Sequence, residues 1–259
     1  MTEAWTQVWR PARVTGNRAV GRGSSLLELE LSDPLPFPFE PGHVAVLRLA
    51  GHRHPYTLSW VDPDRRRVAI LFRIIPGGRL TPVLADLAPG AVVEFSGLHH
   101  SPILDGIAAA AETVVLLGTG SGVGPLWGFS ERSLAAGFPR PILLFAGFRE
   151  AEDICLALEL DRLQAGHGQF RWQATLSRPA PGWTGLRGRL GQSVPPLIPR
   201  PRACHYHLVG NGAMLVEFKL ALSLLGVPEE QVSSEVFFNY NAKAEQEVAQ
   251  AIAAGFRHE

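Results

Sequence analysis

The stretch from Val114 to Pro125, with the sequence VVLLGTGSGVGP, constrains the fold more than any other part of the chain. Its four apolar, partly β-branched residues predict a buried strand of a parallel sheet. Four glycines then turn the chain, and proline suits the first turn of the helix that follows. Such a strand, turn and helix start present backbone N–H groups and the positive end of a helix dipole. The stretch therefore favours a phosphate-bearing ligand, most simply the pyrophosphate of a dinucleotide.

The spacing of these glycines differs from the common dinucleotide fingerprint. The pattern G-x-G-x-x-G requires glycine at position 123, which is Val123. The next predicted strand, residues 141–145, is followed by AGFR and lacks the acidic residue that usually holds a ribose. On this motif alone, an ordinary glycine-rich loop remains an alternative.

Elements beyond about residue 112 alternate between strand and helix patterns. This order predicts a doubly wound parallel α/β sheet, because parallel strands need helical crossovers. We expect strands at 113–117, 141–146, 170–175 and 205–209, and helices at 125–136, 152–164 and 212–225.

The first part of the chain carries short alternating segments instead. Turn signals spaced by roughly 8–12 residues indicate a small antiparallel barrel or sandwich. We expect strands at 25–31, 43–49, 56–61, 67–74 and 91–96, and a helix at 80–87. A composition shift near residues 106–111 marks the boundary between the two parts.

Charge and cysteine content exclude several functional classes. The 24 basic and 24 acidic residues balance, so no overall field favours nucleic acid or an anionic membrane. Two cysteines, Cys155 and Cys204, are too few for an iron–sulfur cluster or a thiolate zinc site. Neither a signal peptide nor a run of 18 apolar residues is apparent. We therefore expect a cytoplasmic protein with no metal, no nucleic-acid partner and no membrane segment.

Two segments of the first part are candidates for ligand binding. In residues 53–59, RHPYTLS, the Tyr56 ring and a nearby hydroxyl group suit a planar ligand, although composition alone favours a packed tyrosine on an edge strand. In residues 76–82, PGGRLTP, Arg79 suits a phosphate, and Thr81 suits a cap or a donor at a helix start. A capped helix after a turn is the alternative there.

Three candidates lie in the second part. Ser177 and Arg178 end a predicted strand, where a Ser–Arg pair suits a 2′-phosphate, and the nearby Arg187 and Arg189 are possible additions. The alternative is a surface loop. Residues 209–214, VGNGAM, form a second strand, glycine turn and helix start, which strengthens the case for a ligand crevice.

A third candidate, His205-x-His207, has the spacing of two metal ligands on one strand face. No third ligand is close in sequence, so ordinary strand histidines explain the pair better.

Six motifs of this chain, in the same order, resemble the ferredoxin–NADP reductase family of flavoproteins. They are HPYT at 54–57, GRLT at 78–81, GTGSGVGP at 118–125, REAEDI at 149–154, VGNGAM at 209–214 and EVFF at 235–238. Each motif is weak alone, but six in order cover nearly the whole chain.

The resemblance implies a two-domain fold with two cofactors. An antiparallel Greek-key β-barrel that binds FAD would span residues 1–107, and a doubly wound α/β domain that binds NADP(H), with NAD(H) possible, would span 108–238. A helical extension would occupy 239–259, where Val248, Ile252 and Phe256 share one helical stripe. This tail would pack on the nucleotide domain or restrict the cleft.

The family's binding residues map onto matching positions. Those implied for FAD are His54, Pro55, Tyr56, Thr57, Phe72, Arg73, Ile74, Gly78, Arg79, Leu80, Thr81, Phe237 and Phe238. Those implied for NAD(P) are Gly118, Thr119, Gly120, Ser121, Gly122, Arg149, Ser177, Arg178, Gly210, Asn211, Gly212 and Met214. Thr57 would bond near the reactive flavin nitrogen, and Glu235 would serve proton transfer or nicotinamide placement.

Two positions depart from the family pattern. His54 replaces an arginine, which weakens a flavin-phosphate contact unless Arg53 or Arg79 substitutes for it. Val209 replaces a cysteine and removes a thiol from the expected hydride-transfer site.

The resulting prediction is a reductase that oxidises NAD(P)H through FAD, with NADPH preferred because of Ser177 and Arg178. Electrons would leave to a separate ferredoxin or flavodoxin, and the protein would be a monomer or weak dimer. Two alternatives remain open: a non-catalytic or regulatory flavin-binding subunit, and a reductase of small molecules such as ferric chelates or flavin.

Overall fold

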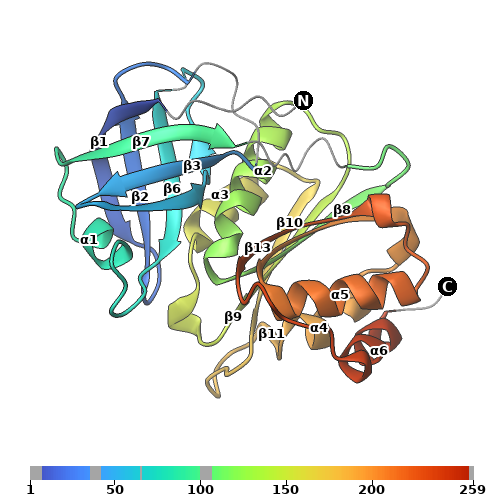
Figure 1. Ribbon diagram of the computed structural model, residues 1–259. Helices are drawn as coiled ribbons and strands as arrows, with labels where there is room; N and C mark the ends of the chain where they lie inside the picture. Colours follow the sequence, from blue (N-terminus) through green and yellow to red (C-terminus); the bar gives the residue numbers. More distant parts are fainter. Residues whose placement is uncertain (1–7, 36–41, 65, 100–106, 257–259) are drawn as a thin grey trace.

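The computed structural model describes residues 8–35, 42–64, 66–99 and 107–256. Two sheets lie side by side, a curled antiparallel sheet from the first part of the chain and a parallel sheet from the second (Figure 1). The predicted two-part architecture is therefore confirmed.

The curled sheet has seven antiparallel strands in the order β4-β3-β7-β1-β2-β6-β5. The strands are β1 (Trp9–Ala19), β2 (Ser24–Leu31), β3 (Val44–Leu49), β4 (His52–Thr57), β5 (Trp60–Val61), β6 (Arg67–Arg73) and β7 (Val92–His99), with the short helix α1 (Thr81–Ala85). Alternate residues of β2, including Leu27, Leu29 and Leu31, fill the inside of the curl. The sheet curls far enough to bring the rings of Tyr56 and Phe72 within 6.2 Å between centroids.

Two details of this sheet differ from the prediction. Strand β1 was not expected, and the strand expected at residues 56–61 is wrong, because the chain leaves β4 after Thr57 and enters β5 at Trp60. Ser59 causes the break: its N–H donates to Ala69 O at 2.8 Å, and its hydroxyl accepts from the Leu71 N–H at 3.0 Å. These bonds hold Ser59 against β6, so the chain passes from β4 at one edge of the sheet to β5 at the other edge.

The parallel sheet has the strand order β11-β10-β9-β8-β12-β13. Its strands are β8 (Thr113–Thr119), β9 (Ile142–Phe148), β10 (Phe170–Leu176), β11 (Leu186–Arg187), β12 (Cys204–Asn211) and β13 (Val232–Phe238). Helices α2 (Val123–Ala135) and α3 (Ala157–Gly166) pack on one face, and α4 (Leu190–Ser193), α5 (Gly212–Leu224) and α6 (Gln246–Gly255) on the other (Figure 1). Short 3-10 helices are η2 (Gly120–Gly122), η3 (Ala151–Asp153), η4 (Pro195–Leu197), η5 (Pro201–Ala203) and η6 (Glu229–Gln231). The central strands are apolar on both sides because helices cover both faces.

The helix expected at 152–164 is wrong at its start. The chain first forms η3, and Leu156 then takes a left-handed conformation with φ of 60° before α3 begins at Ala157. The expected tail helix is present as α6, and its stripe packs on α4 and α5, with Ile252 and Phe256 buried. This helix lies on the side of the parallel sheet away from the curled sheet (Figure 1), so it supports the nucleotide half rather than restricting the cleft.

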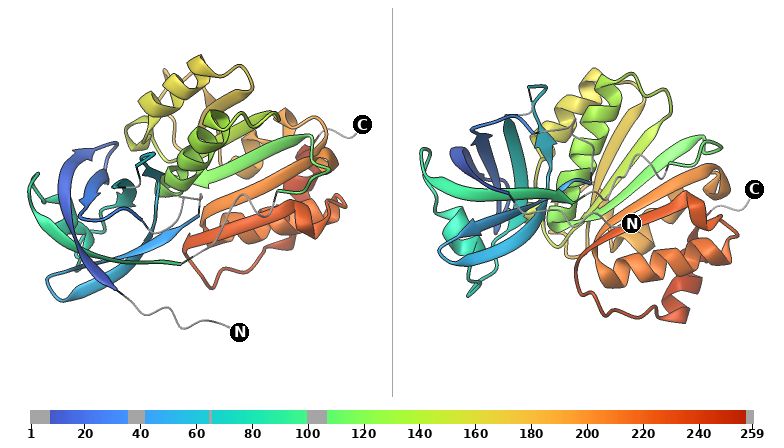
Figure 2. Two further views of the ribbon diagram at one scale, coloured as in Figure 1. Left: turned by 90° about the horizontal axis from the view of Figure 1, so that it is seen from above. Right: turned by 45° about the horizontal axis from the view of Figure 1, so that its top comes forward.

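Helix α2 connects the two sheets, running between them in Figure 2. Two of its glycines allow this close approach. A Cβ at Gly128 would overlap the carbonyl oxygen of Ser59, and a Cβ at Gly124 would lie 2.5 Å from the Ser59 hydroxyl. Helix and strand backbones therefore touch directly, which sets the orientation of one half against the other.

A second connection joins the β1–β2 turn to the segment after β9. Arg22 pairs with Glu150 at 2.8 Å and with Asp153 at 2.9 Å, and Arg18 pairs with Glu159.

None of the helices in the described part of the chain has the length and hydropathy needed to span a bilayer.

Candidate functional site

The two predicted glycine loops meet at the carboxyl edge of the parallel sheet. Strand order reverses between β8 and β12, since β9 and β10 lie on one side of β8 and β12 lies on the other. Ligands of open α/β sheets bind in the crevice at such a reversal. Residues 118–122 include the end of β8 and the turn after it, and residues 210–212 include the end of β12 and the start of α5. The Asn211 N–H donates to Thr119 Oγ1 at 2.9 Å. The loops therefore form one structure.

Glycine is required in these loops by the close packing of backbones. A Cβ at Gly122 would lie 2.7 Å from the Val209 carbonyl oxygen. A Cβ at Gly210, whose φ is 125°, would overlap the Thr119 hydroxyl, and one at Gly212 would overlap the Asn239 carbonyl oxygen. Gly120 differs, because it has a φ of 55° and open space beside it. Gly120 is therefore the point of the loop that a ligand can approach.

The two helix starts at this edge are not equivalent. Helix α5 is capped by its own side chain, since Asn211 Oδ1 accepts from the Ala213 N–H at 3.1 Å. Helix α2 begins without a side-chain cap. Uncapped N–H groups and the helix dipole attract an anion. The start of α2 is thus the better phosphate site of the two.

Thr57 and Glu235, the two predicted catalytic residues, touch across the two halves. Thr57 is the last residue of β4 and is buried, and its hydroxyl donates to Glu235 Oε1 at 2.5 Å. Glu235 lies on β13 opposite Val209 of β12. Burial raises the pKa of the Glu235 carboxyl, and the hydrogen bond from Thr57 acts in the opposite direction. Glu235 Oε2 is buried and has no hydrogen-bond partner among the described residues.

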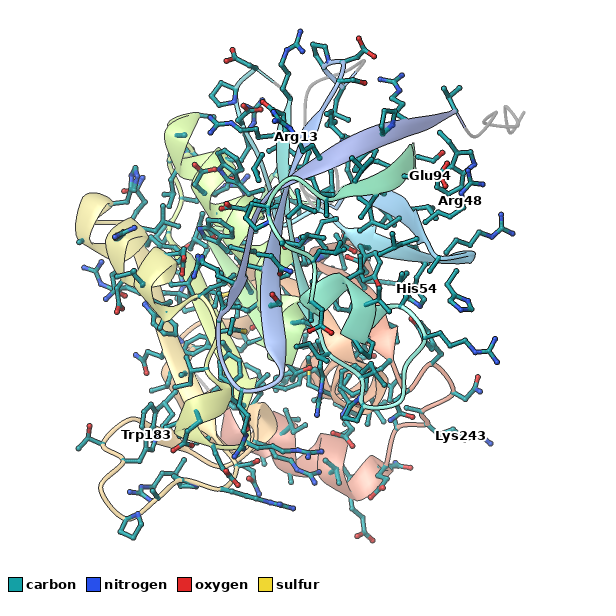
Figure 3. The ribbon with its side chains drawn as sticks, turned by 90° about the vertical axis from the view of Figure 1, so that its left-hand side faces the viewer. Arg13, Arg48, His54, Glu94, Trp183 and Lys243 are labelled. Atoms are coloured by element: carbon teal, nitrogen blue, oxygen red, sulfur yellow. The ribbon has the colours of Figure 1, made fainter. Side chains whose placement is uncertain are left out.

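Tyr56 lies beside this pair on β4. Its ring contacts Phe72 edge-on and lies 5.4 Å from the His54 ring between centroids. Its hydroxyl is buried and unpartnered within the described residues, and burial raises the tyrosine pKa to about 12. A buried hydroxyl without a partner is costly, so this O–H suits a ligand that accepts a hydrogen bond. His54 and Pro55 are exposed at the surface of the curled sheet (Figure 3).

The other residues implied for FAD divide into interior and surface groups. Phe72 and Leu80 belong to the core of the curled sheet and can only support the site. Arg73 and Arg79 are exposed. Thr81 does not cap α1; its Oγ1 accepts from the Ile75 N–H at 2.9 Å.

Two further members of this group complete the turn before α1. Ile74 is half-buried against the core of the curled sheet. Gly78 is required by close packing, because a Cβ there would lie 2.9 Å from the Ile75 carbonyl oxygen.

Residues implied for the nucleotide gather at the ends of β9 and β10. The Arg178 N–H donates to Arg149 O at 2.8 Å, which places these two exposed arginines side by side next to Ser177. Arg187 is not available in the same way, because its guanidinium donates to the carbonyls of Trp183 and Pro181.

Three further residues of the nucleotide half belong to other segments. Trp183, on the loop between β10 and β11, lies on the side of the molecule opposite His54 in Figure 3. Met214 is a buried residue of α5 and belongs to the core, so it lies away from the loop surface. Ser121 is half-buried in the glycine loop.

The turn after β13 is held against the second glycine loop. Phe237 packs against the core of one sheet face, whereas Phe238 is 45% exposed. Asn239 has a φ of 61°, and its amide donates to Asn211 Oδ1 at 3.2 Å. The Tyr240 hydroxyl donates to Phe237 O at 2.8 Å. Asn239 was not singled out from the sequence, and an asparagine directly after the aromatic motif was the available signal.

Metal binding finds no support in the described residues, which hold no group of three or more His, Cys, Asp or Glu with suitable placement. His205 and His207 both contact Ser233. Cys155 and Cys204 are free and buried, and burial raises their pKa values to about 12 and about 11.

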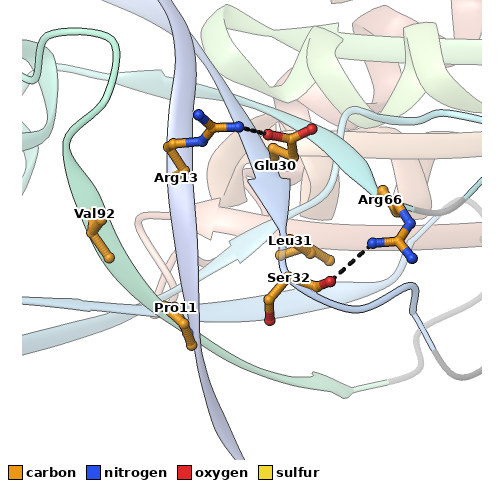
Figure 4. Close-up of a pocket in the computed structure, with 7 residues that line it drawn as sticks. All are labelled: Pro11, Arg13, Glu30, Leu31, Ser32, Arg66 and Val92. Atoms are coloured by element: carbon orange, nitrogen blue, oxygen red, sulfur yellow. Dashed lines mark hydrogen bonds and ion pairs between the residues drawn. The ribbon is translucent and has the colours of Figure 1, made fainter.

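A shallow cavity of about 350 Å³ lies elsewhere, on the outside of the curled sheet (Figure 4). It is lined by Pro11, Arg13, Glu30, Leu31, Ser32, Arg66 and Val92. Arg13 pairs with Glu30, and Arg66 donates to Ser32 O at 2.9 Å. These charged groups are satisfied within the protein, so the cavity adds nothing to the site described above.

Comparison with known proteins agrees with this geometry. Residues 116–218 match the family described as Oxidoreductase NAD-binding domain. The chain is 31% identical over 238 residues to ferredoxin–NADP reductase B of Sorangium cellulosum, covering 86% of this chain and 96% of that protein. It is 26% identical over 251 residues to the reductase component of a naphthalene 1,2-dioxygenase system of Pseudomonas putida, covering 91% and 73%.

A solved structure shares the fold along its whole length. The ferredoxin NADP⁺ reductase of Neisseria gonorrhoeae, solved with bound FAD and NADP, superposes with a TM-score of 0.73 at 17% identity. The match covers 89% of this chain and 99% of that one.

Proposed function

The chain belongs to the ferredoxin–NADP reductase family, and we propose that it oxidises NADPH through bound FAD and passes the electrons to a separate acceptor protein. The hydrogen bond between Thr57 and Glu235 carries this proposal. It joins the strand that bears the flavin motif to the strand that lies beside the nucleotide loops. Two cofactors held by these halves would meet at this pair.

The residues of the curled sheet fit FAD. Tyr56 offers a buried hydroxyl with no partner among the described residues, and its half-buried ring lies beside the exposed His54. Arg73 and Arg79 are exposed cations near the glycine turn before α1 and suit a pyrophosphate. When bound, the flavin accepts a hydride and releases its electrons singly, a chemistry that belongs to the cofactor.

The roles of the chain's own residues follow from their placement. Thr57 holds the Glu235 carboxyl in one orientation through Oε1. Burial favours the protonated form of Glu235, so this carboxyl keeps a proton at Oε2 to a higher pH than an ordinary glutamate does. Together they orient what binds at the meeting point of the halves.

A preference for NADPH over NADH rests on the arginine pair. Arg149 and Arg178 lie side by side and exposed at the ends of β9 and β10, next to Ser177. A 2′-phosphate accepts charge-assisted hydrogen bonds from guanidinium groups, and a 2′-hydroxyl gains far less from them. The start of α2 and Gly120 would hold the pyrophosphate.

The acceptor we propose is an acidic ferredoxin or flavodoxin in the cytoplasm. Arg53 on β4, Arg73 at the end of β6 and Arg79 before α1 are exposed cations of the flavin half, and an acidic partner would be steered to them. The naphthalene dioxygenase reductase component named above serves a ferredoxin, and the sequence likeness supports a related acceptor here.

An anaerobic titration tests this function. Purified protein loaded with FAD should lose its yellow absorbance on addition of NADPH, more readily than with NADH, and should then reduce an added ferredoxin or flavodoxin. Yellow protein that never bleaches would favour a regulatory flavin-binding subunit. Rapid reduction of a ferric chelate with no protein acceptor would favour a small-molecule reductase, and protein that takes up no flavin would end the proposal.

A further inference from the structure

A row of polar side chains runs along one face of the parallel sheet toward Glu235. In β12 and β13, His207 pairs with Ser233, and Val209 pairs with Glu235. Because side chains alternate along a strand, His205, His207 and Val209 share one face with Ser233 and Glu235. Both histidines are buried. The proposed hydride-transfer mechanism uses Glu235 alone and leaves the other polar members of the row without a role.

Each hydrogen bond in this row can be assigned a donor and an acceptor. The backbone N–H of Ala108 lies 3.3 Å from His205 Nδ1 and can only donate, so this nitrogen accepts. His205 Nε2 then carries the hydrogen and donates to Ser233 Oγ at 3.1 Å. The Ser233 hydroxyl has one hydrogen and two acceptors within reach, His207 Nδ1 at 2.8 Å and Tyr206 O at 3.4 Å. The shorter contact is the stronger bond, so Ser233 donates to His207 Nδ1. A neutral His207 that accepts at Nδ1 must carry its hydrogen on Nε2.

Both histidines are neutral near pH 7, which this assignment of donors and acceptors requires. Burial, with the charge of Arg140, lowers the pKa of His205 to about 4. Burial lowers the pKa of His207 to about 3, and the charge of Lys219 on α5 acts in the same direction.

Two buried atoms remain unpartnered among the described residues at the end of the row. One is His207 Nε2, a donor by the argument above, and the other is Glu235 Oε2, an acceptor when ionised. The two residues lie on adjacent strands, on the same face, one register pair apart. Diagonal neighbours of this kind lie within reach of one bridging water molecule.

We propose that His207 is a positioning residue for Glu235, donating from Nε2 through one water molecule to Glu235 Oε2. Ser233 and His205 fix the tautomer of His207 that makes this possible. The carboxyl is then held at both oxygens, by Thr57 on one and by the water on the other. The inference rests on the proposed function only in taking Glu235 as the carboxylate of the cleft.

Carbon-13 NMR of the glutamate side-chain carboxyls tests this in the FAD-loaded full chain, with no nucleotide added. Glu235→Gln identifies the resonance. His207→Leu removes the donor and should raise the pKa of Glu235 by about one unit, because a donor stabilises the ionised form. His207→Gln retains one acceptor and one N–H donor, and should restore a value close to that of the wild type. A purely structural role for His207 predicts no such rescue.

Ser233→Ala provides a second variant if His207→Leu does not fold. Without the serine hydroxyl the tautomer of His207 is no longer fixed, so the Glu235 pKa should rise by a smaller amount. An unchanged Glu235 pKa in folded His207→Leu or in folded Ser233→Ala overturns the inference. Because no nucleotide is used, a shifted pKa in protein that NADPH fails to bleach would remove the proposed function alone.

Discussion

The candidate site is built differently in the two halves of the molecule. On the curled sheet the candidate site consists of side chains, with Tyr56, Thr57 and Arg79 presented by β4 and by the turn before α1. On the parallel sheet it consists mainly of backbone, where Gly122 and Gly210 lie too close to neighbouring chain segments to carry a side chain.

This difference determines which amino-acid substitutions each half tolerates. A site built from side chains responds to the identity of each residue, and His54 in place of the family's arginine is such a change. A site built from backbone responds instead to any added atom that separates its loops. A methyl group added to the second half therefore tests how closely its backbone segments pack. A charge restored to the first half tests the contribution of one side chain.

The largest expected effect is at the backbone contact between the halves. Gly128→Ala would place a methyl group on the Ser59 carbonyl oxygen, and overpacking of this severity costs about 3 kcal/mol. Denaturant unfolding should show this loss in the free energy of unfolding. Gly166→Ala, at a helix glycine with open space around it, is the matched control and should change stability little. Equal stability of Gly128→Ala and the wild type would mean that α2 does not touch the curled sheet so closely.

Next in size is the effect of removing an exposed charge from the nucleotide half. Arg178→Ala should weaken NADPH binding by about 2–3 kcal/mol, the worth of charge-assisted hydrogen bonds. NADH binding should hardly change. Calorimetric titration with both nucleotides measures the difference, and equal losses would refute the assignment of Arg178 to the 2′-phosphate.

A smaller gain is expected on the flavin half. His54→Arg restores a permanent charge at an exposed position of β4 and should tighten FAD binding by about 1 kcal/mol. His52→Arg makes the same chemical change two residues earlier on the same strand, outside the flavin motif, and should leave FAD affinity unchanged. Fluorescence titration of apoprotein with FAD compares the two. A gain of the same size in both variants would point to a general charge effect.

The smallest expected effect is a pH dependence of stability that arises from Glu235 at its contact with Thr57. Because burial raises the pKa of Glu235 in the folded protein, the unfolded state ionises first as pH rises. The free energy of unfolding therefore falls as pH rises above the pKa of the Glu235 carboxyl in the unfolded state. It stops falling once the carboxyl of the folded protein has also ionised. Glu235→Gln removes this loss, so its advantage over the wild type should be larger at pH 7 than at pH 4 in denaturant unfolding. A constant difference between the two proteins would contradict the raised pKa.

Local sequence patterns located most strands and helices of the second half of the molecule, although they missed β11 and β13 and placed the start of α3 too early. The apolar run at 114–117 and the glycines after it specify a strand, a turn and a helix without help from distant residues. In the first half the same approach missed β1, whose half-exposed residues and register shift between Val14 and Gly16 give no clean alternation. It also merged β4 with β5, because the bonds that break the strand at Ser59 come from β6.

The family motifs were sufficient to propose candidate residues for the site, but not to give its geometry. Thr57 and Glu235 are separated by 178 positions, and only the family motifs indicated that they meet. The row from His205 to Glu235 gave no such signal, because it depends on the register of β12 against β13 and on the backbone of Ala108. Direct contacts between distant strands are set by tertiary packing and leave little trace in local sequence.

The central claim is that the two halves form one reaction site through Thr57 and Glu235. A double-mutant cycle on the anaerobic rate of flavin reduction by NADPH, with Thr57→Val, Glu235→Gln and the double variant, tests it most directly. The account predicts that the two effects are not additive, with a coupling energy of about 1 kcal/mol or more. Additive effects of the two substitutions would contradict it, because residues that act in one site do not behave independently.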